Sequence, residues 1–168
     1  MHPKQTIYVS RKRKSAAGLL SVLMIVFAVI FLLAGILLSR GFLLPCFLMA
    51  GLYFVFDVFS KRDYEYILEN NHLQIDLIRG KRFRSTEHVI DLQNLVVLAP
   101  HDHEAVAGYR KGGSSAGIPK YDYTSYDDSV PYYTMIAYEN KKQVKLLLDL
   151  DDAFLAQMKQ EYPERVYR

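Results

Sequence analysis

The sequence predicts a helical membrane hairpin followed by an α+β domain, in which antiparallel strands are capped by one C-terminal helix. Three observations predict this class. Residues 16–38 form an apolar run without a charge, and residues 41–59 carry only Asp57. From Tyr64 onward apolar and polar residues alternate as in strands, and after residue 150 apolar residues recur at helical spacing. The 168 residues therefore hold a small apolar part and one domain of ordinary size.

The charges are divided unevenly between the two parts. The residues before the first apolar run include five bases and no acid: Lys4, Arg11, Lys12, Arg13 and Lys14. From residue 61 onward the chain holds 15 basic and 17 acidic residues. The net charge of +3 therefore comes from the N-terminal segment, and the slightly acidic remainder argues against a nucleic-acid partner.

A membrane-spanning helix needs roughly 20 apolar residues to cross about 30 Å of hydrocarbon. We predict transmembrane helices over residues 16–38 and 41–60, joined as an antiparallel hairpin because only Ser39 and Arg40 separate the apolar runs. Asp57 falls in the last turn, where a carboxylate reaches the headgroup region. A signal peptide would have a shorter apolar run and a small-residue cleavage site. Two buried soluble helices would each carry a polar stripe.

Lysine and arginine near the helix ends predict the orientation of the hairpin. Residues 1–15 form a basic tail, Lys61 and Arg62 follow the second helix, and Arg40 alone lies in the link. Both termini should then face the cytoplasm, and the chain should be a multi-pass protein of the cell (inner) membrane. One expected partner is the lipid bilayer, contacted at the membrane surface by Arg11, Lys12, Arg13, Lys14, Lys61 and Arg62.

Alternation and turn residues predict the strands of the remaining chain. The expected strands cover residues 64–68, 73–77, 81–86, 90–98 and 121–126, followed by a hairpin of residues 132–138 and 143–148. Turn residues separate them at Asn70-Asn71, Gly80, Pro100 and Asn140-Lys141. Residues 99–131 are long for a structureless loop, and the stretch Gly112-Gly113-Ser114-Ser115 inside them is linker-like.

A C-terminal amphipathic helix follows the last strand. Asp149 or Asp151 can cap this helix by accepting a bond from an early backbone N–H, and Pro163 stops it. Its apolar residues recur at helical spacing and should pack on the sheet: Phe154, Leu155, Met158 and Tyr162.

Residues with ligand chemistry gather at His101-Asp102-His103-Glu104. His101 and His103 could bind one ion, but zinc sites use three or four ligands and no further ligand pair stands out. We therefore expect a structural or solvated loop, with a metal site as the alternative. The single cysteine, Cys46, lies in the second apolar run without a histidine nearby, and no catalytic Ser, His and Asp spacing is recognisable. We predict no catalytic residue, metal or cofactor.

Six tyrosines accompany the long loop: Tyr109, Tyr121, Tyr123, Tyr126, Tyr132 and Tyr133. Tyrosine concentrates at contact surfaces because it adds area with little entropy cost. Aromatic residues in strands, in contrast, usually belong to the core or to cross-strand pairs. We single out these six residues as the candidate partner-binding surface.

Several segments resemble a known module. Tyr64-Glu65-Tyr66, Leu73-Gln74-Ile75 and Val89-Ile90-Asp91-Leu92, followed by Leu95-Val96-Val97, are similar to the first four strands of the pleckstrin-homology-like (PH-like) domain. The bacterial version of that domain often follows a transmembrane hairpin. The whole chain, with Ala99-Pro100, Tyr121-Asp122-Tyr123-Thr124-Ser125 and Pro163, resembles an uncharacterised family of small membrane proteins from Gram-positive bacteria.

The resemblance implies a half-open antiparallel β-barrel of six or seven strands capped by the final helix, over residues 62–168. Such domains hold phosphoinositides or peptides. The lipid-binding version uses basic residues around the first strand pair, where this chain has Asn70-Asn71, so headgroup recognition of that kind is not expected. Lys81, Arg82 and Arg84 alternate along one face and either touch the membrane or protect an edge strand.

We therefore expect a membrane-anchored, non-enzymatic protein whose cytoplasmic PH-like domain docks or scaffolds protein or lipid partners, among them other membrane proteins. Two alternatives stay open at this point. One is a membrane-anchored metal-dependent hydrolase that uses His101, His103 and the nearby acids. The other is an accessory subunit of a transporter or secretion complex, in which the hairpin itself makes the contacts.

Overall fold

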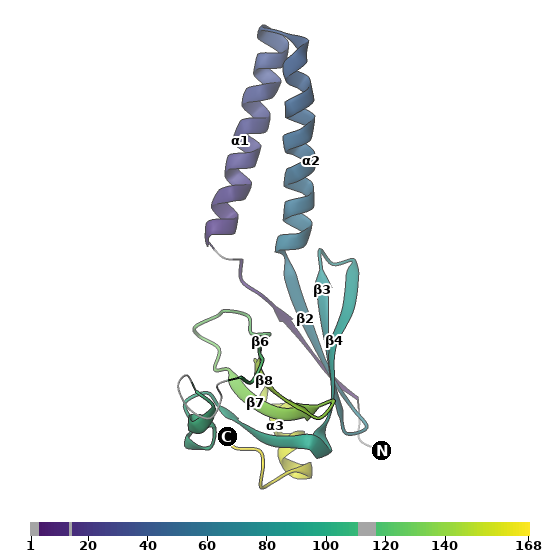
Figure 1. Cartoon of the computed structure of the whole chain (residues 1–168), viewed down its shortest axis with the longest axis vertical. Coiled ribbons are helices and arrows are strands. Elements are labelled where there is room, and N and C mark those ends of the chain that lie inside the picture. The colour runs from purple at the N-terminus through teal and green to yellow at the C-terminus, as the bar shows by residue number, and fades with distance from the viewer. Residues whose placement is uncertain (1–3, 14, 111–116) are drawn as a thin grey trace. The chain divides into compact units, whose positions relative to one another are not determined.

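The structure is a computed structural model that describes residues 4–13, 15–110 and 117–168. Contacts divide it into a domain unit, made of Met1–Arg11, Asp63–Ile78 and Arg84–Arg168, and a helical unit, made of Lys12–Arg62 and Arg79–Phe83. Figure 1 labels the main elements. In chain order the elements are β1 (Gln5–Ser10), α1 (Ser15–Leu37), η1 (Arg40–Phe42), α2 (Leu43–Ser60), β2 (Arg62–Glu69), β3 (His72–Arg79), β4 (Phe83–Asp91), η2 (Leu92–Asn94), β5 (Leu95–Pro100), η3 (Glu104–Tyr109), β6 (Lys120–Asp122), β7 (Tyr133–Glu139), β8 (Lys142–Leu148) and α3 (Asp152–Glu161).

The helical unit is a pair of antiparallel helices, α1 and α2, joined by the 3₁₀ turn η1 (Figure 1). The less exposed positions of α1 recur every three or four residues and include Ala17, Ser21, Met24, Ala28, Phe31 and Gly35. Such spacing is that of two helices packed along a narrow seam. At Gly35 an added Cβ would lie 2.6 Å from Leu43 Cδ2, so glycine is what lets α1 approach the start of α2 here.

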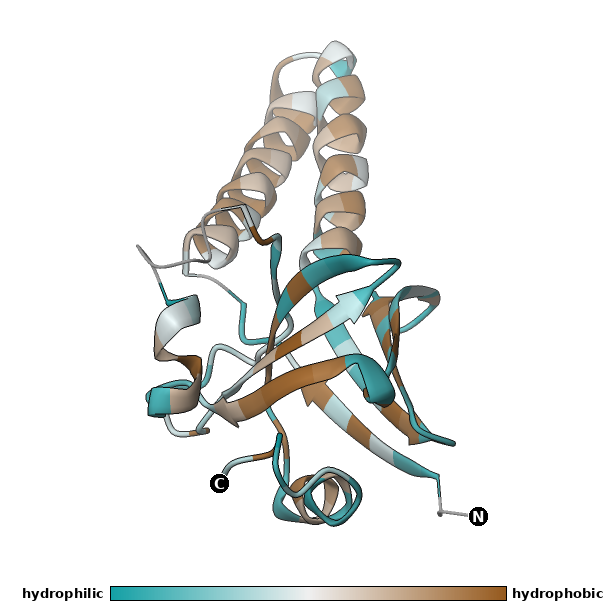
Figure 2. Cartoon of the chain, turned by 60° about the horizontal axis from the view of Figure 1, so that its bottom comes forward, coloured by the Kyte–Doolittle hydropathy of each residue, from teal (hydrophilic) through white to brown (hydrophobic). Residues whose placement is uncertain are grey.

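The outer faces of both helices carry large apolar side chains that are exposed. Leu37 is 77% exposed and Phe47 is 75% exposed, whereas a core helix of a soluble protein hides such side chains. In Figure 2 brown, the colour of hydrophobic residues, predominates on both helices. Ser15–Leu37 and Arg40–Ser60 are both long and apolar enough to cross a membrane.

The domain unit begins with a strand where the sequence analysis places a basic tail. Residues 5–10 form β1, which pairs antiparallel with β2 and sets Val9 opposite Tyr64. Val9 is buried and belongs to the main core, so this part of residues 1–15 is domain and not tail. The segment Thr6 to Val9 has good strand formers, but its partner strand follows only after both helices.

The described strands form two four-stranded sheets, ordered β1-β2-β3-β4 and β5-β7-β8-β6. In the second sheet β7 pairs antiparallel with both β5 and β8, whereas β6 pairs parallel with β8. From Arg62 onward the described residues hold seven strands, and these strands do not close into a barrel. The second sheet is therefore mixed where a purely antiparallel arrangement is predicted.

The strand expected over residues 121–126 is short and displaced. β6 ends at Asp122, because the carboxylate of Asp122 accepts hydrogen bonds from the backbone N–H of Thr124 at 3.1 Å and from its hydroxyl at 2.8 Å. Tyr126 then adopts a φ of +60°, which no strand residue has. The chain thus leaves the sheet after three residues, and residues 123–132 are free to form the wall of a pocket.

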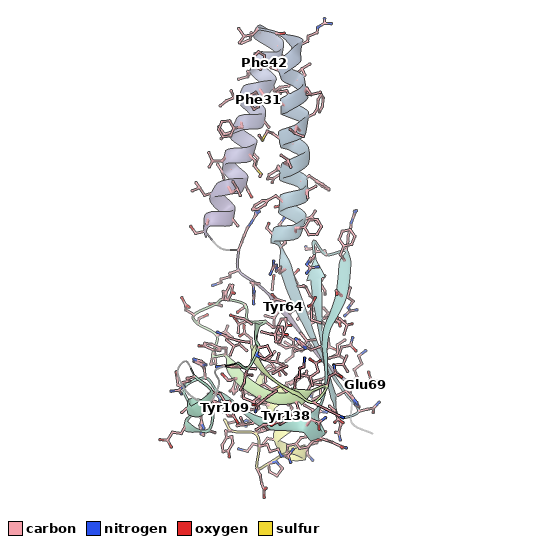
Figure 3. The ribbon with its side chains drawn as sticks, in the orientation of Figure 1. Phe31, Phe42, Tyr64, Glu69, Tyr109 and Tyr138 are labelled. Carbon is pink, nitrogen blue, oxygen red and sulfur yellow. The ribbon has the colours of Figure 1, made fainter. Side chains whose placement is uncertain are left out.

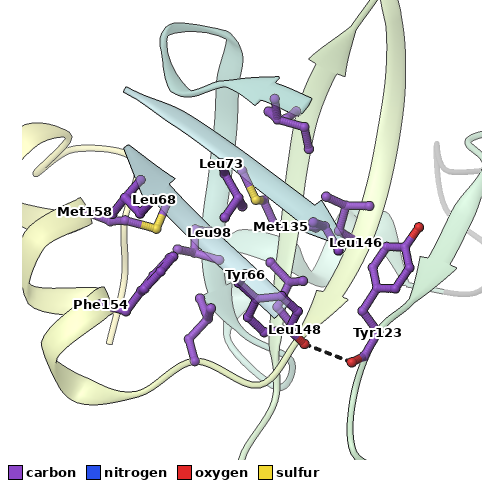
Figure 4. Close-up of a cluster of buried hydrophobic side chains, with 14 of the residues drawn as sticks. Tyr66, Leu68, Leu73, Leu98, Tyr123, Met135, Leu146, Leu148, Phe154 and Met158 are labelled. Carbon is purple, nitrogen blue, oxygen red and sulfur yellow. Dashed lines mark hydrogen bonds between the residues drawn. The ribbon is translucent and has the colours of Figure 1, made fainter. Parts of the chain in front are cut away.

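The main core contains apolar side chains from both sheets and from α3, and Figure 4 shows Tyr66, Leu98, Leu146 and Phe154 among them. The hydroxyl of Tyr66 donates a hydrogen bond to the carbonyl of Tyr123 at 2.8 Å, drawn as a dashed line in Figure 4. Burial raises the pKa of Tyr66 far above its usual value, so this hydroxyl keeps its proton.

The C-terminal helix follows its prediction. Asp151 is the N-cap, and its Oδ1 accepts a hydrogen bond from the N–H of Phe154 at 2.7 Å. The helix ends at Glu161, two residues before Pro163. Phe154, Leu155 and Met158 are all buried, so the predicted face of the helix covers the core.

Candidate functional site

A pocket of about 470 Å³ opens in the domain unit where β5 and β8 end and β7 begins. We call it the Asp-Tyr pocket. Its lining comes from three segments of the second sheet and its loops: Pro100, His101, Asp102, Lys120, Asp122, Thr124, Tyr126, Asp127, Asp128, Val130, Pro131, Tyr132, Leu147 and Asp149. The lining therefore combines carboxylates with aromatic and apolar groups.

Negative charge dominates this lining, because five aspartates stand against one lysine. Asp102 and Asp128 are exposed, so their charges face solvent at the mouth. Asp149 is buried, and its Oδ2 accepts a hydrogen bond from the N–H of Ser125 at 2.8 Å. Carboxylates gathered around a concave surface focus a negative potential and attract cations.

The aromatic side of the pocket is built by Tyr126, Tyr132 and His101. The rings of His101 and Tyr132 lie 4.6 Å apart, and His101 Nδ1 makes a hydrogen bond of 3.0 Å with the hydroxyl oxygen of Thr134 on β7. Burial lowers the pKa of His101 below its usual 6.5. Burial also raises the pKa of Tyr132, with further contributions from Asp102 and Asp122. Both side chains are therefore uncharged at neutral pH.

Arg11 is bound to the segment of the pocket lining that ends β6 and follows it. Its Nε donates to the carbonyl of Thr124 at 3.0 Å, and its Nη2 donates to the carbonyl of Asp122 and to Asp122 Oδ1, the latter at 3.2 Å. The guanidinium carbon lies 4.1 Å from the ring centre of Tyr126 and 4.8 Å from that of Tyr64. The side chain of Arg11 is only 12% exposed, so the prediction that Arg11 touches the membrane surface is wrong.

The remaining basic residues of that prediction lie in the helical unit or outside the described residues. Arg13 turns inward: its Nη2 donates to Ser21 Oγ and to Ser60 Oγ, each at 2.7 Å, and its Nη1 lies 3.3 Å from Asp57 Oδ1. Lys61 donates to the other oxygen of Asp57 at 2.7 Å. We call this group the Arg13 clamp.

Lys12 and Arg62 are exposed, as a headgroup contact requires. Lys14 lies outside the described residues, as does the Gly112-Gly113-Ser114-Ser115 stretch. The membrane-surface role of Lys12, Lys14, Lys61 and Arg62 stays a prediction.

The six predicted tyrosines do not form one surface. Tyr126 and Tyr132 line the Asp-Tyr pocket, whereas Tyr123 is 6% exposed and belongs to the core, because its carbonyl and ring are held from inside by Tyr66 and Tyr64. Tyr121 is 38% exposed and packs edge-on against His88.

The last two tyrosines of the predicted surface are partly buried. Tyr133 packs against the main core, and Tyr109 packs on the second, smaller core cluster beneath η3. Figure 3 shows Tyr109 and Tyr138 on different elements of the domain. Two of the six residues are thus placed to meet a partner in the pocket.

The His101 to Glu104 cluster has a structural role. His103 is the N-cap of η3, and its Nδ1 accepts a hydrogen bond from the N–H of Ala105 at 3.1 Å. The ring of His103 also packs 4.9 Å from that of Tyr167. Among the described residues no group of three or more His, Cys, Asp or Glu side chains is placed to hold a metal ion. The metal site considered as an alternative therefore has no such ligand set within the described part of the chain.

Arg84 lies over a buried acid pair on β2 and β3. Glu65 is 4% exposed and Asp76 is 2% exposed, and Arg84 contacts both carboxylates, with its Nε 2.7 Å from Asp76 Oδ2. Gln74 and Thr86 also donate to Asp76, each at 2.8 Å. Arg84 is thus a partner of buried charges, in addition to any role in protecting the edge strand β4.

The pocket could not be predicted from the sequence because its charged residues are scattered along the chain. Asp102, Asp122 and Asp149 come from three separate segments, and only the sheet order and the parallel pairing of β6 with β8 bring them together. The local signal that could have pointed to it is the tyrosine and aspartate content of residues 121–132.

A family model described as Bacterial PH-like domain (DUF6106) matches residues 6–168. The match starts inside β1 and includes both helices, so the helical unit lies within the family's own sequence pattern. The searches of curated proteins and of solved structures found no match.

Proposed function

The chain belongs to the bacterial PH-like domain family, and from this premise we propose that it is a membrane-anchored docking module. Its docking site is the Asp-Tyr pocket, and its partner is a protein that presents a positively charged segment there. The single observation that carries this proposal is the surplus of carboxylates beside Tyr126 and Tyr132 in a preformed pocket.

The chemistry of the lining supports a cationic side chain as the occupant. A lysine or arginine has an apolar stem and a charged head, and the pocket offers Val130 and Pro131 for the stem and carboxylates for the head. Tyrosine faces also attract cations, above all guanidinium groups. A phosphate or an anionic lipid headgroup would meet five aspartates and one lysine, so the same lining disfavours those ligands.

The helical unit supplies the anchor in this proposal. Two exposed apolar helices would hold the chain in the bilayer as a multi-pass hairpin, with both termini and the domain on the cytoplasmic side. Anchoring restricts the domain to a thin layer beside the membrane and so raises its effective concentration toward other membrane proteins. Weak contacts in one pocket then suffice for specific docking.

Site-directed photo-crosslinking in intact membranes tests this function. A photo-crosslinking amino acid replaces Val130, which lines the pocket and is 38% exposed. The matched control replaces Tyr138, which is 47% exposed on β7 and does not line the pocket. Mass spectrometry then identifies the peptide captured at each position.

The proposal predicts capture at position 130 of a segment rich in lysine and arginine, and little capture of that segment at position 138. Asp102→Asn combined with Asp128→Asn should reduce the capture, and both residues are exposed, so the fold should tolerate the change. Equal capture at both positions, or capture that survives the double substitution, would overturn the proposed docking site.

A further inference from the structure

Arg11 joins the two units of the chain in sequence, and its side chain belongs wholly to the domain unit. It is the last residue of the first domain segment, and the helical unit begins at Lys12. β1 ends at Ser10, so Arg11 has left the sheet and its side chain is free to reach the loop that follows β6. Three residues separate Arg11 from the start of α1.

The contacts of Arg11 are concentrated on one segment of the pocket wall. Both of its carbonyl partners, Asp122 and Thr124, line the Asp-Tyr pocket, and so does Tyr126, whose ring lies against the guanidinium. The guanidinium also lies over the ring of Tyr64 on β2. Arg11 itself does not line the pocket. It therefore ties the wall to the first sheet from behind.

We infer that Arg11 is a positioning residue of the docking pocket. It holds residues 122–126 in the shape that the partner's cation meets, and it orients Tyr126 by covering the rear face of the ring. This inference rests on the proposed function, because the shape matters only if the pocket binds a partner. Its physical basis is a planar guanidinium whose several donors bridge two carbonyls and one carboxylate, which a lysine cannot reproduce.

Charge and position make opposite predictions for this residue. If Arg11 acted through its charge alone, its removal would make the pocket more negative and strengthen the binding of a cation. If Arg11 positions the wall, its removal lets residues 122–126 relax and weakens binding despite the gain in negative potential. The sign of the change in affinity therefore separates the two roles.

The test uses the full chain in nanodiscs of uncharged phosphatidylcholine. The probe is a fluorescently labelled peptide of alternating arginine and alanine, and the measurement is its dissociation constant by fluorescence anisotropy. The variants are Arg11→Gln, which loses the charge, and Arg11→Lys, which keeps it. The matched control is Arg165→Gln, because Arg165 also holds two backbone carbonyls, those of Gln93 and Leu95, at a place outside the pocket.

Both Arg11 variants should bind the probe about tenfold more weakly, the loss expected for charge-assisted hydrogen bonds that order a site. The Arg165 variant should bind the probe as tightly as the unmodified chain. Unchanged or tighter binding by Arg11→Gln would overturn the inference. Weakening by Arg11→Gln with full recovery in Arg11→Lys would overturn it as well, because a lysine would then hold the wall without the planar guanidinium.

A second readout does not depend on any partner. With 3-fluorotyrosine at position 126, the fluorine resonance should move and sharpen in Arg11→Gln as the ring loses the guanidinium and gains motion. A resonance unchanged in that variant would refute the positioning role even if the pocket binds the probe. If instead the unmodified chain fails to bind the probe while the resonance shifts as expected, the proposed function is wrong and the structural role of Arg11 stands.

Discussion

Ser10 and Asp63 form a direct pair at the end of the first sheet: Ser10 Oγ donates a hydrogen bond to Asp63 Oδ1 at 2.6 Å, and the two residues are register partners in β1 and β2. The next residue after Ser10 leads toward α1, and the residue before Asp63 follows α2. The helical unit is therefore an insertion between two hydrogen-bonded strands of one sheet. A family match that starts at residue 6 agrees with this arrangement, since β1 is part of the domain.

The insertion predicts that β1 is essential for the stability of the domain. Val9→Asp should unfold the domain or lower its free energy of unfolding by about 3 kcal/mol or more. Val9 is 7% exposed in the core, and an unpaired charge is costly there. Tyr8→Asp is the control, since Tyr8 is 71% exposed on the same strand. Thermal unfolding of the full chain measures both. Equal melting temperatures for the two variants would show that residues 4–10 are a tail that does not contribute to the stability of the domain.

The Arg13 clamp predicts a defined spacing at one end of the helical unit. Arg13→Ala removes the hydrogen bonds to Ser21 and Ser60 and the ion pair with Asp57, so the helix ends should separate more widely. The cost should be about 1 to 3 kcal/mol for hydrogen bonds that involve a charged group. Spin labels at positions 16 and 59 in a Cys46→Ser background should show a broader distance distribution.

The matched control for the clamp is Arg40→Ala, because Arg40 begins the link at the other end of the helices. This variant loses one positive charge as Arg13→Ala does, and it should leave the distance distribution narrow. Broadening of equal size in both variants would show that the clamp does not order the helix ends.

The buried acid pair predicts a strong dependence on Arg84. Arg84→Ala leaves the carboxylates of Glu65 and Asp76 buried without their cation, and it should lower the free energy of unfolding by about 2 kcal/mol. Breaking a fully buried ion pair would cost more, but the Arg84 side chain is half exposed and water screens its charge. Glu65→Gln added to Arg84→Ala should recover part of that loss. Chemical denaturation measures the series. A harmless Arg84→Ala would mean that Arg84 acts only as an exposed edge charge.

His101 predicts how docking depends on pH. Burial lowers its pKa below 6.5, and Asp102 opposes this shift while Lys145, Arg110 and Lys120 add to it. Its imidazole is therefore neutral above pH 6.5 and gains a positive charge as the pH falls through its lowered pKa. Because this new charge faces the pocket, the affinity for a cationic segment should fall by about threefold over that interval. The free energy of unfolding follows the same direction. The contribution of His101 to it is fully present above pH 6.5 and is lost as the pH falls through the lowered pKa.

Binding of the arginine peptide between pH 7.5 and pH 5 measures this effect. His101→Gln should lose the weakening between pH 6.5 and pH 5, and its affinity at each pH is compared with its own value at pH 7.5. An identical pH profile in the histidine variant would assign the effect to another group.

Local patterns predicted the elements whose signal lies within a few residues. Asn70 and Asn71 adopt positive φ of 48° and 64° in the turn predicted for them, and Asp151 caps α3. β1 was missed because a short strand before a basic cluster looks like a flexible tail, and its partner strand is 53 residues away at the Ser10 to Asp63 pair. Such a pairing leaves no trace in local periodicity.

The candidate site was predicted only in part for the same reason. Proximity to the apolar run made Arg11 and Arg13 look like membrane-surface residues, whereas partners far along the chain, Asp122 and Asp57, bind them. Tyrosine content singled out the correct loop but could not separate Tyr123, which faces the core, from Tyr126, which faces the pocket. Which of the two tyrosines faces the core depends on where β6 ends. The hydrogen bond from the N–H of Thr124 to the carboxylate of Asp122 determines that end.

The charge preference of the pocket is the central claim, and a peptide titration tests it most directly. The full chain in phosphatidylcholine nanodiscs is titrated with the labelled arginine-alanine peptide and with a glutamate-alanine peptide of equal length, and anisotropy gives both dissociation constants. We predict that the arginine peptide binds and that the glutamate peptide does not. Asp102→Asn with Asp128→Asn should raise the dissociation constant of the arginine peptide by about fivefold or more. Equal binding of the two peptides, or no effect of the double substitution, would contradict the proposed docking function.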